Sequence, residues 1–144
     1  MMELVDGEVE LTDDAEIYWR QCAPCDYDED NKRPTDRVFR ATDADKGKMS
    51  GARSRKASAE AAYLHRTTVV KKPSKGTWGV SVGVVKAAGS RVVDDSVLQP
   101  APPPNPPPGH SYVDVRHLDD LNKRERQRFR STLLIAAFLA HSEP

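Results

Sequence analysis

The sequence predicts a single α+β domain with a small mixed β-sheet and two helices, the second of them C-terminal. Side chains alternate in character along Ile17–Cys22 and along Thr77–Lys86, as they do in strands. Two other segments, Ala59–Arg66 and a stretch after Asn122, begin with residues that cap helices. The length of 144 residues suits one domain with one core.

An acidic leader over residues 1–16 precedes the domain proper, which we place at residues 17–144. Residues 1–30 hold eleven acidic residues against Arg20 alone, whereas residues 31–93 hold fifteen Lys and Arg against four acidic residues. This segregation favours either an arm directed at a partner or a leader that folds back and neutralises the basic region. The leader itself is expected to form a short edge strand or an extended arm.

Strands and loops are expected to alternate through the first half of the domain. The strand Ile17–Cys22 is followed by the charged loop Asp26–Pro34. Thr35–Arg40 predicts a short strand or an ordered loop pinned by its two apolar residues. Asp43–Lys56 contains two glycines and five basic residues and is expected to be a mobile surface loop.

A helix and the clearest strand follow. Ser58 is the expected N-cap of the helix Ala59–Arg66, and Thr77–Lys86 has the valine alternation of a central strand. A further short strand is expected at residues 91–93. The order of these elements, with no internal repeat, is typical of an α+β fold.

The last third of the chain begins with a proline-rich segment, Gln99–Gly109, which contains seven of the eleven prolines. Such a composition favours polyproline II, so the segment is a stiff spacer or a ligand for an aromatic-lined groove. His110–Arg116 then resumes a strand pattern. Asn122 and Glu125 form an expected capping pair for a helix that continues to about His141.

The composition argues for a cytoplasmic protein. The apolar fraction is 38%, the charged fraction is 31% and the mean hydropathy is −0.67. No apolar run approaches the length of a membrane span, and no secretory signal pattern follows Met1. Two cysteines without such a signal fit a reducing compartment.

Arg20 is the first candidate functional residue. It lies inside an otherwise buryable strand, and an unpaired buried charge is very costly. Arg20 is therefore either a structural partner for a carboxylate or carbonyl, or part of a site that holds an anionic ligand.

The pair Cys22 and Cys25 allows three interpretations. The Cys-x-x-Cys spacing suits a redox dithiol, or half of a structural zinc site that two histidines would have to complete. Two ordinary thiols at a strand end also explain it. Because the chain has no second Cys-x-x-Cys and no paired histidine motif, we expect no metal and no cofactor, with zinc as the alternative.

Two surfaces are expected to bind a macromolecular partner. The helix end Leu133–Ala140 is apolar all round, so Leu134 and Phe138 are candidates for contact with another protein or a second copy of the chain. A basic cluster could track the phosphates of a nucleic acid, although it lacks interleaved aromatics and favours that partner only weakly. Its candidate contact residues are Lys46, Lys48, Arg53, Arg55, Lys56, Lys71, Lys72 and Lys75, and Arg66 belongs to the same cluster.

Several blocks of residues resemble a group of small bacterial proteins for which no activity is known. The likeness spans roughly residues 17–120. It rests mainly on Trp19-Arg20-Gln21-x-x-Pro24, Ser58-Ala59-Glu60-Ala61-Ala62 and Gly76-Thr77-Trp78-Gly79-Val80-Ser81-Val82. We expect Val-His where this chain has Cys22-Ala23, which argues against a shared role for the cysteines. The resemblance implies a bacterial or phage origin and a shared fold.

A more distant resemblance is to the compact ADP-ribosyl-transfer folds, including NAD-degrading RES-type toxins. It rests on an early strand arginine, a Gly/Ser-containing loop, a helix and a valine strand. It implies that Arg20 would hold the phosphates of NAD, Ser50 the ribose, and Glu60 the transition state.

These observations lead to three functional hypotheses. The first is a non-catalytic cytoplasmic bacterial protein that binds another protein, as an accessory or antiviral-defence component. The second is a NAD-consuming enzyme using Arg20, Ser50 and Glu60. The third is a structural zinc-binding protein that uses Cys22 and Cys25.

Overall fold

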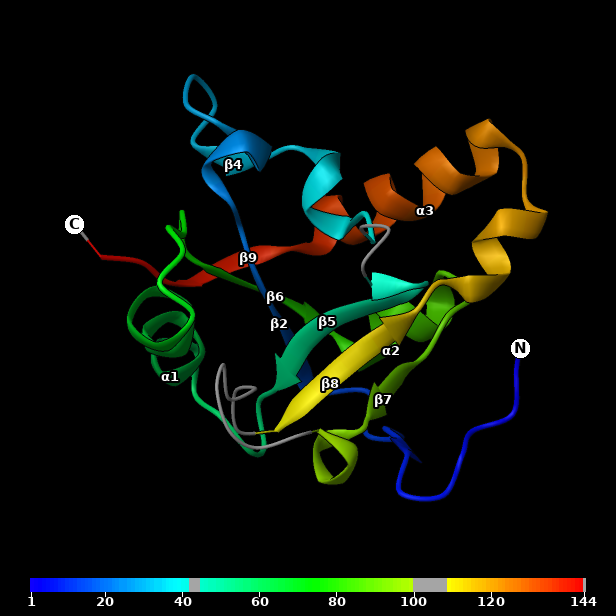
Figure 1. Cartoon of the computed structure of the whole chain (residues 1–144). Coiled ribbons are helices and arrows are strands. Elements are labelled where there is room, and N and C mark those ends of the chain that lie inside the picture. Colours follow the sequence, from blue (N-terminus) through cyan, green and yellow to red (C-terminus); the bar gives the residue numbers. More distant parts are fainter. Residues whose placement is uncertain (42–44, 100–108, 144) are drawn as a thin grey trace.

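The structure is a computed structural model that describes residues 1–41, 45–99 and 109–143 (Figure 1). Its helices are α1 (Ala59–Leu64), α2 (Val82–Ala87) and α3 (Lys123–Ala136), and a π-helix (His65–Val69) continues α1. Its strands are β1 (Val9–Glu10), β2 (Ile17–Gln21), β3 (Tyr27–Asp28), β4 (Arg33–Pro34), β5 (Lys48–Arg53), β6 (Thr77–Ser81), β7 (Val92–Asp94), β8 (His110–Asp114) and β9 (Phe138–His141). Short 3₁₀ turns span Pro24–Asp26, Asp36–Phe39, Ser96–Leu98 and Arg116–Asp120.

Seven of these strands form one sheet in the order β1-β7-β8-β5-β2-β6-β9, and β3 and β4 form a separate hairpin. Every pairing between the described strands is antiparallel. The predicted α+β class and the C-terminal helix are confirmed. The sheet is larger than the sequence indicated, and a third helix, α2, was not expected.

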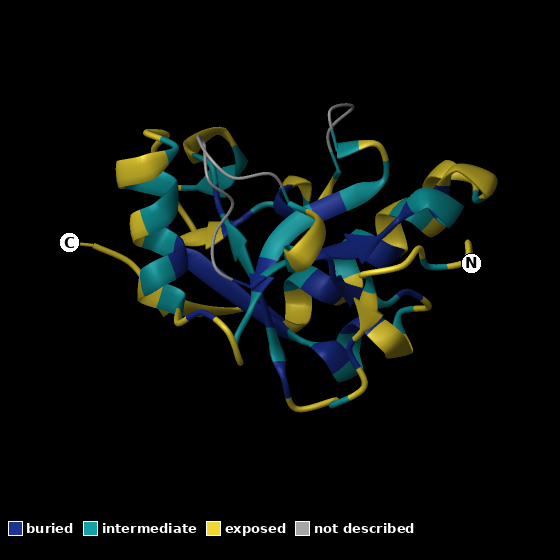
Figure 2. Ribbon diagram, turned by 60° about the horizontal axis from the view of Figure 1, so that its bottom comes forward, coloured by how far each residue is buried: buried dark blue, intermediate teal, exposed yellow. Residues whose placement is uncertain are grey.

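The core lies between one face of the sheet and the helices α2 and α3 (Figure 1). Tyr18, Met49 and Val113 on the central strands are fully buried, and Phe129 and Leu133 of α3 pack into the same cluster. Figure 2 shows the buried residues concentrated on the strands and the exposed ones on the surrounding turns and helix surfaces. Burial of these large side chains is the main stabilising contribution.

The other face of the sheet carries α1 at one end. The Trp19 indole donates to the Ala57 carbonyl at 2.9 Å, and the Thr77 hydroxyl donates to the Ala59 carbonyl at 2.9 Å. Ser58 caps α1 as predicted, because its Oγ accepts from the Ala61 amide at 3.0 Å. Trp19 and Thr77 therefore fix the start of α1 on the face of the sheet opposite the core.

The predicted strand over Thr77–Lys86 is wrong in its second half. β6 ends at Ser81, whose Oγ accepts from the Val84 amide at 3.2 Å and so caps α2. Val82 and Val85 are fully buried, three residues apart on one side of α2. The valine alternation suited a strand equally well, and tertiary burial decided in favour of a helix.

The expected surface loop Asp43–Lys56 is also wrong over most of its length. Residues 48–53 form β5, a central strand that pairs with β2 and β8. Gly51 is required there because a Cβ at this position would collide with the Trp19 carbonyl and the Tyr18 ring. A glycine that permits close packing inside a strand is easily mistaken for a loop residue.

The C-terminal helix ends earlier than predicted. Asn122 caps α3 as expected, its side chain accepting from the Glu125 amide at 2.9 Å. The helix stops at Ala136, however, and β9 follows as an edge strand paired with β6. The apolar run was therefore not one helix buried all round but a helix end followed by a strand.

The acidic leader belongs to the sheet through β1, which pairs with β7 at one edge. Glu16 lies almost fully buried and receives two hydrogen bonds of 2.7 Å from the guanidinium of Arg53. The same guanidinium donates to Asp94 at 2.9 Å. The leader thus folds back and neutralises part of the basic region, as one of the two interpretations expected.

The remaining predictions have mixed outcomes. Thr35–Arg40 forms an ordered 3₁₀ turn with Val38 and Phe39 buried. The proline-rich segment lies almost entirely outside the described residues. Within the described residues, no helix is long and apolar enough to cross a membrane.

Candidate anion-binding site

The side chain of Arg20 is held in the gap where β2 and β5 separate. The two strands pair at Tyr18 and Trp19 but not at Arg20. Beyond that point the Arg20 guanidinium, and not the backbone hydrogen bonds of a strand pair, connects β2 to β5. It donates to the Ser50 carbonyl and, at 3.0 Å, to the Val38 carbonyl. Carbonyl groups orient a guanidinium without removing its positive charge.

A second arginine, Arg66, lies nearby in the π-helix. Burial lowers the pKa of Arg66, and the charge of Arg20 lowers it further. Its Nε is buried and has no hydrogen-bond partner among the described residues. Insertions of π-helix within helices are rare and occur frequently at functional sites. The charge of Arg20 therefore acts on the guanidinium of Arg66, and Arg66 has a buried donor unused within the described part of the chain.

Neither of these two arginines forms an ion pair with a carboxylate among residues 1–41, 45–99 and 109–143. By contrast, Arg53, Arg91 and Arg116 all do. Two neighbouring half-buried cations that form no ion pair with a described carboxylate repel one another and lose solvation. Guanidinium groups bind phosphate and carboxylate through paired N–H donors. The pair Arg20 and Arg66 is therefore suited to hold an anion.

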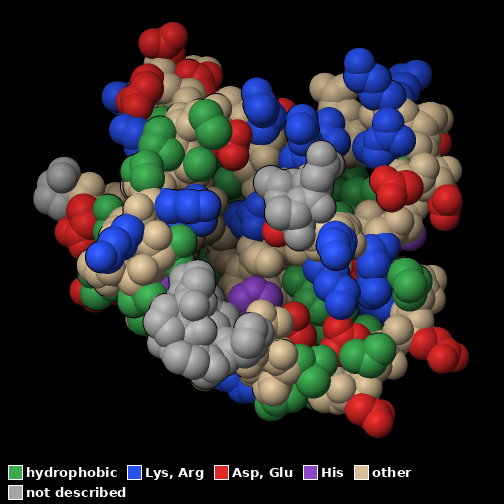
Figure 3. All heavy atoms as spheres, viewed as in Figure 1, with side chains coloured by type: hydrophobic (Ala, Val, Ile, Leu, Met, Phe, Trp, Pro, Cys, Tyr) green, Lys and Arg blue, Asp and Glu red, His purple; other side chains and the backbone are tan. Residues whose placement is uncertain are grey.

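Figure 3 views the sheet from the face opposite α2 and α3. Lys and Arg side chains gather on this face around a hollow between α1 and the strands, and a histidine side chain lies at the hollow.

The residues nominated for a NAD-consuming enzyme are only partly brought together. Arg20 reaches Ser50, but it contacts the Ser50 backbone carbonyl and not the hydroxyl. Glu60 lies exposed in the first turn of α1. The sequence placed Arg66 only in the basic cluster, and its relation to Arg20 was not expected, because nothing near Arg66 along the chain indicates it.

The basic cluster predicted to contact a partner is largely paired. Arg53 is mostly buried in its pairing with Glu16 and is not part of an exposed surface. The other paired members are Lys48 with Glu8, Arg55 with Asp13 and Glu16, Lys56 with Asp94, and Lys75 with Glu29. Lys46, Lys71 and Lys72 are exposed.

The two cysteines differ in burial. Cys22 is buried, and burial raises the pKa of its thiol to about 12, which disfavours the thiolate that redox chemistry and metal binding require. Cys25 is exposed. Among the described residues, no three His, Cys, Asp or Glu side chains come together as a metal site.

The C-terminal candidates are partly exposed. Leu134 is half-buried, whereas Phe138 is 43% exposed and its ring packs edge-on against Trp19 with centroids 6.2 Å apart. Ile135 on the same segment is 82% exposed and is the most solvent-exposed large apolar residue described. It was not singled out from the sequence.

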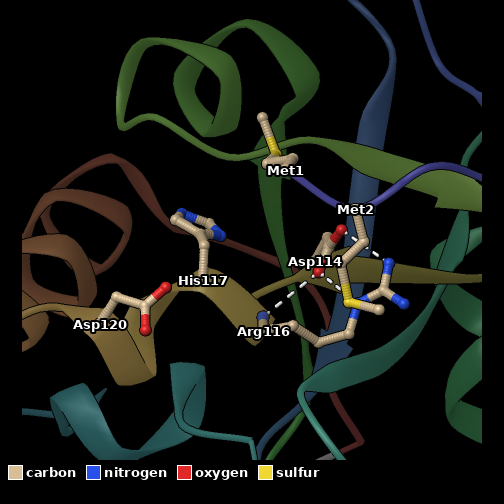
Figure 4. Close-up of a pocket in the computed structure, with 6 residues that line it drawn as sticks. All are labelled: Met1, Met2, Asp114, Arg116, His117 and Asp120. Atoms are coloured by element: carbon tan, nitrogen blue, oxygen red, sulfur yellow. Dashed lines mark hydrogen bonds and ion pairs between the residues drawn. The ribbon is translucent and has the colours of Figure 1, made fainter.

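A pocket of about 350 Å³ lies away from the arginine pair (Figure 4). Its lining residues are Met1, Met2, Asp114, Arg116, His117 and Asp120. Asp114 is neutralised there by Arg116 and Arg91, and these groups tie β8 to its neighbours. His117 has a buried Nδ1 without a partner among the described residues, but no other group in Figure 4 points at that atom.

Comparisons with protein-family models, with curated proteins and with solved structures find no match for this chain. The resemblances drawn from its sequence blocks remain predictions. The function is therefore argued from the site.

Proposed function

We propose that the protein binds a small phosphate-bearing ligand between Arg20 and Arg66. The observation that carries this proposal is the juxtaposition of two guanidinium groups that have no carboxylate partner in the described part of the chain, one with a buried, unused Nε. A protein gains stability when an anion binds such a pair, because the ligand removes the repulsion that the folded state otherwise retains.

A nucleotide of the NAD class fits this proposal better than an isolated phosphate. Two arginines from separate elements, β2 and the π-helix, can engage two phosphate groups of one ligand. This supports the binding half of the enzyme hypothesis. It leaves Glu60 without a role, since that residue is exposed at the far end of α1.

Isothermal titration calorimetry with inorganic pyrophosphate, ADP and NAD tests the proposal on the intact chain. We expect saturable binding that weakens as salt is raised. Arg66→Gln should abolish it, whereas Arg124→Gln, which changes an exposed arginine on α3, should leave it unchanged. If wild-type protein binds none of these anions at low salt, the proposal is wrong.

A second candidate function is protein binding through the C-terminal segment. Ile135 is 82% exposed, and Phe138 and Leu139 lie on β9, whose outer edge has no strand partner among the described residues. Exposed apolar residues on an open edge favour association. We propose this segment as the contact for a second copy of the chain or another protein, in an accessory or defence-associated role.

Analytical ultracentrifugation separates this candidate from the first. Ile135→Glu should convert an associating protein into a monomer without changing its unfolding midpoint. A wild-type protein that sediments as a monomer and retains no partner from its host would contradict the protein-binding function.

A further inference from the structure

The outward face of α3 is basic and polar over its first three turns. Phe129 and Leu133 of this helix are buried in the core, so the opposite side of the helix faces solvent. At 3.6 residues per turn, that side carries two arginines and two neutral polar residues at the spacing i, i+3, i+4 and i+7. These residues are Arg124, Gln127, Arg128 and Ser131.

The cations of this face have no carboxylate partner within the described part of the chain. Of the basic residues on α3, only Arg130 pairs with a described carboxylate, that of Asp36 at 3.3 Å. Lys123, Arg124 and Arg128 are exposed and form no such pair. The basic cluster predicted over residues 46–75 differs, because most of its members are paired. The structure therefore leaves α3 with an accessible row of uncompensated positive charge.

Figure 3 shows Lys and Arg side chains gathered over α3, at the upper right of the view. The N-terminus of the helix lies at the same end as Lys123 and Arg124. The amide groups of a helix N-terminus add a partial positive charge, which attracts phosphate. The side chains and the backbone of α3 thus favour an anionic partner at the same place.

The spacing of the charges fits a row of phosphates. Arg124 and Arg128 are one turn apart, or about 6 Å along the helix axis. Each strand of a duplex carries a phosphate about every 3.4 Å along its own axis. Guanidinium groups bind phosphate through paired donors, and the side chains of Gln127 and Ser131 can donate to phosphate oxygens as well.

Other polyanionic partners fit this face less well. Proteins that bind single-stranded nucleic acid stack its bases on aromatic side chains, whereas Phe129 of α3 is buried. A helix that lies on a membrane presents an apolar face to the lipid. The outward face of α3 has instead one exposed large apolar residue, Ile135, near the C-terminal end.

We infer that the outward face of α3 binds the phosphate backbone of a nucleic-acid duplex. The contacts are to phosphates, so the binding is independent of base sequence and depends strongly on salt. This inference does not rest on the anion site at Arg20 and Arg66, because it uses a different surface and different residues.

Fluorescence anisotropy of a short labelled DNA duplex tests the inference on the intact chain. We expect wild-type protein to bind the duplex at about 50 mM salt and more weakly at about 200 mM. The double variant Arg124→Gln, Arg128→Gln should flatten the plot of log Kd against log salt by about 1.8, because two phosphate contacts are lost. The matched control is Lys71→Gln, Lys72→Gln, which removes the same charge from exposed positions outside α3 and should leave the slope unchanged.

Three results would overturn the inference. The first is no binding of the duplex by wild-type protein at low salt. The second is an equal loss in both double variants, since net charge and not α3 would then be responsible. The third is tighter binding of a labelled polyglutamate peptide than of the duplex, which would indicate an acidic protein partner. Arg66→Gln should bind the duplex as wild-type protein does, so failure of the anion site is recognised separately.

Discussion

The positive charge of Arg20 lies close enough to Arg66 to lower the pKa of its guanidinium. Neither group forms an ion pair with a carboxylate in the described parts of the chain, although acidic residues pair with Arg53, Lys56, Arg91 and Arg116. A protein retains such an arrangement at a cost in stability when the repulsion serves ligand binding.

Arg66→Gln should stabilise the protein in the absence of ligand while it removes anion binding. The substitution relieves like-charge repulsion and the desolvation of a half-buried guanidinium, and a gain of about 0.5–1 kcal/mol is typical of such changes. Urea denaturation in phosphate-free buffer measures it. Arg124→Gln is the control and should leave the midpoint in place. A loss of stability in Arg66→Gln would contradict the interpretation of Arg66 as a ligand-binding residue.

Arg20→Ala should destabilise the fold. The carbonyls of Val38 and Ser50 would lose their donor in a partly buried place, at a cost of about 1–3 kcal/mol for each group left unsatisfied. Arg40→Ala provides the comparison, because Arg40 is exposed and contributes only its backbone carbonyl. Its unfolding midpoint should match that of the wild type. Equal midpoints for both variants would show that Arg20 does not hold the strands together.

Acid should lower the free energy of unfolding, because Asp114 becomes protonated. Burial raises the pKa of this carboxyl, but hydrogen bonds from Arg116 and Arg91 outweigh it and hold the pKa at about 2. Because the folded value lies below the unfolded one of about 3.9, the stabilisation is complete above pH 4 and is lost as the pH falls toward 2. Urea titrations between pH 7 and pH 2 measure this.

Asp114→Asn supplies the complementary change. It should remove most of that pH dependence and cost about 3 kcal/mol or more at pH 7, because two arginines lose their buried partner. The exposed Asp119→Asn should do neither. An unchanged acid transition in Asp114→Asn would assign the effect to other carboxylates.

Gly51→Ala should be among the more damaging small substitutions. The added methyl group would meet the Trp19 carbonyl and the Tyr18 ring, both fixed in the central sheet, and overpacking of this kind costs about 1–3 kcal/mol. Gly89→Ala tests a different cause. Its Cβ would enter open space, and only the positive φ of 92° opposes it. Thermal unfolding of the two variants should show the larger loss for Gly51→Ala.

Local signals in the sequence predicted helix caps and strands correctly where the pattern of a segment fitted only one kind of secondary structure. Ser58 and Asn122 cap their helices as expected, and β2 and β8 lie where alternation placed them. The predictions were wrong where the deciding contact was distant. Nothing near Gly51 along the chain indicates that the Tyr18 ring will lie against it.

The residues of the candidate site also differ in whether local or distant contacts reveal them. Arg20 was identified because a charge inside a strand requires an explanation. Arg66 was grouped only with the basic cluster, and the pairing of His110 with Asp95 was not expected, because both relations depend on what packs beside these residues. The pairing of His110 with Asp95 spans fifteen residues that include the proline-rich segment, and no spacing rule connects the two.

The two outer strands of the sheet come from opposite ends of the described chain, β1 from its start and β9 from its last residues. A nascent chain can therefore cover the outer edge of β6 only after Phe138–His141 has left the ribosome. Until then, β6 presents an unpaired edge with Trp78 and Gly79 to every other emerging chain. Synthesis at high local density should therefore favour exchange of β9 between neighbouring copies, and dilution should favour its return to its own sheet.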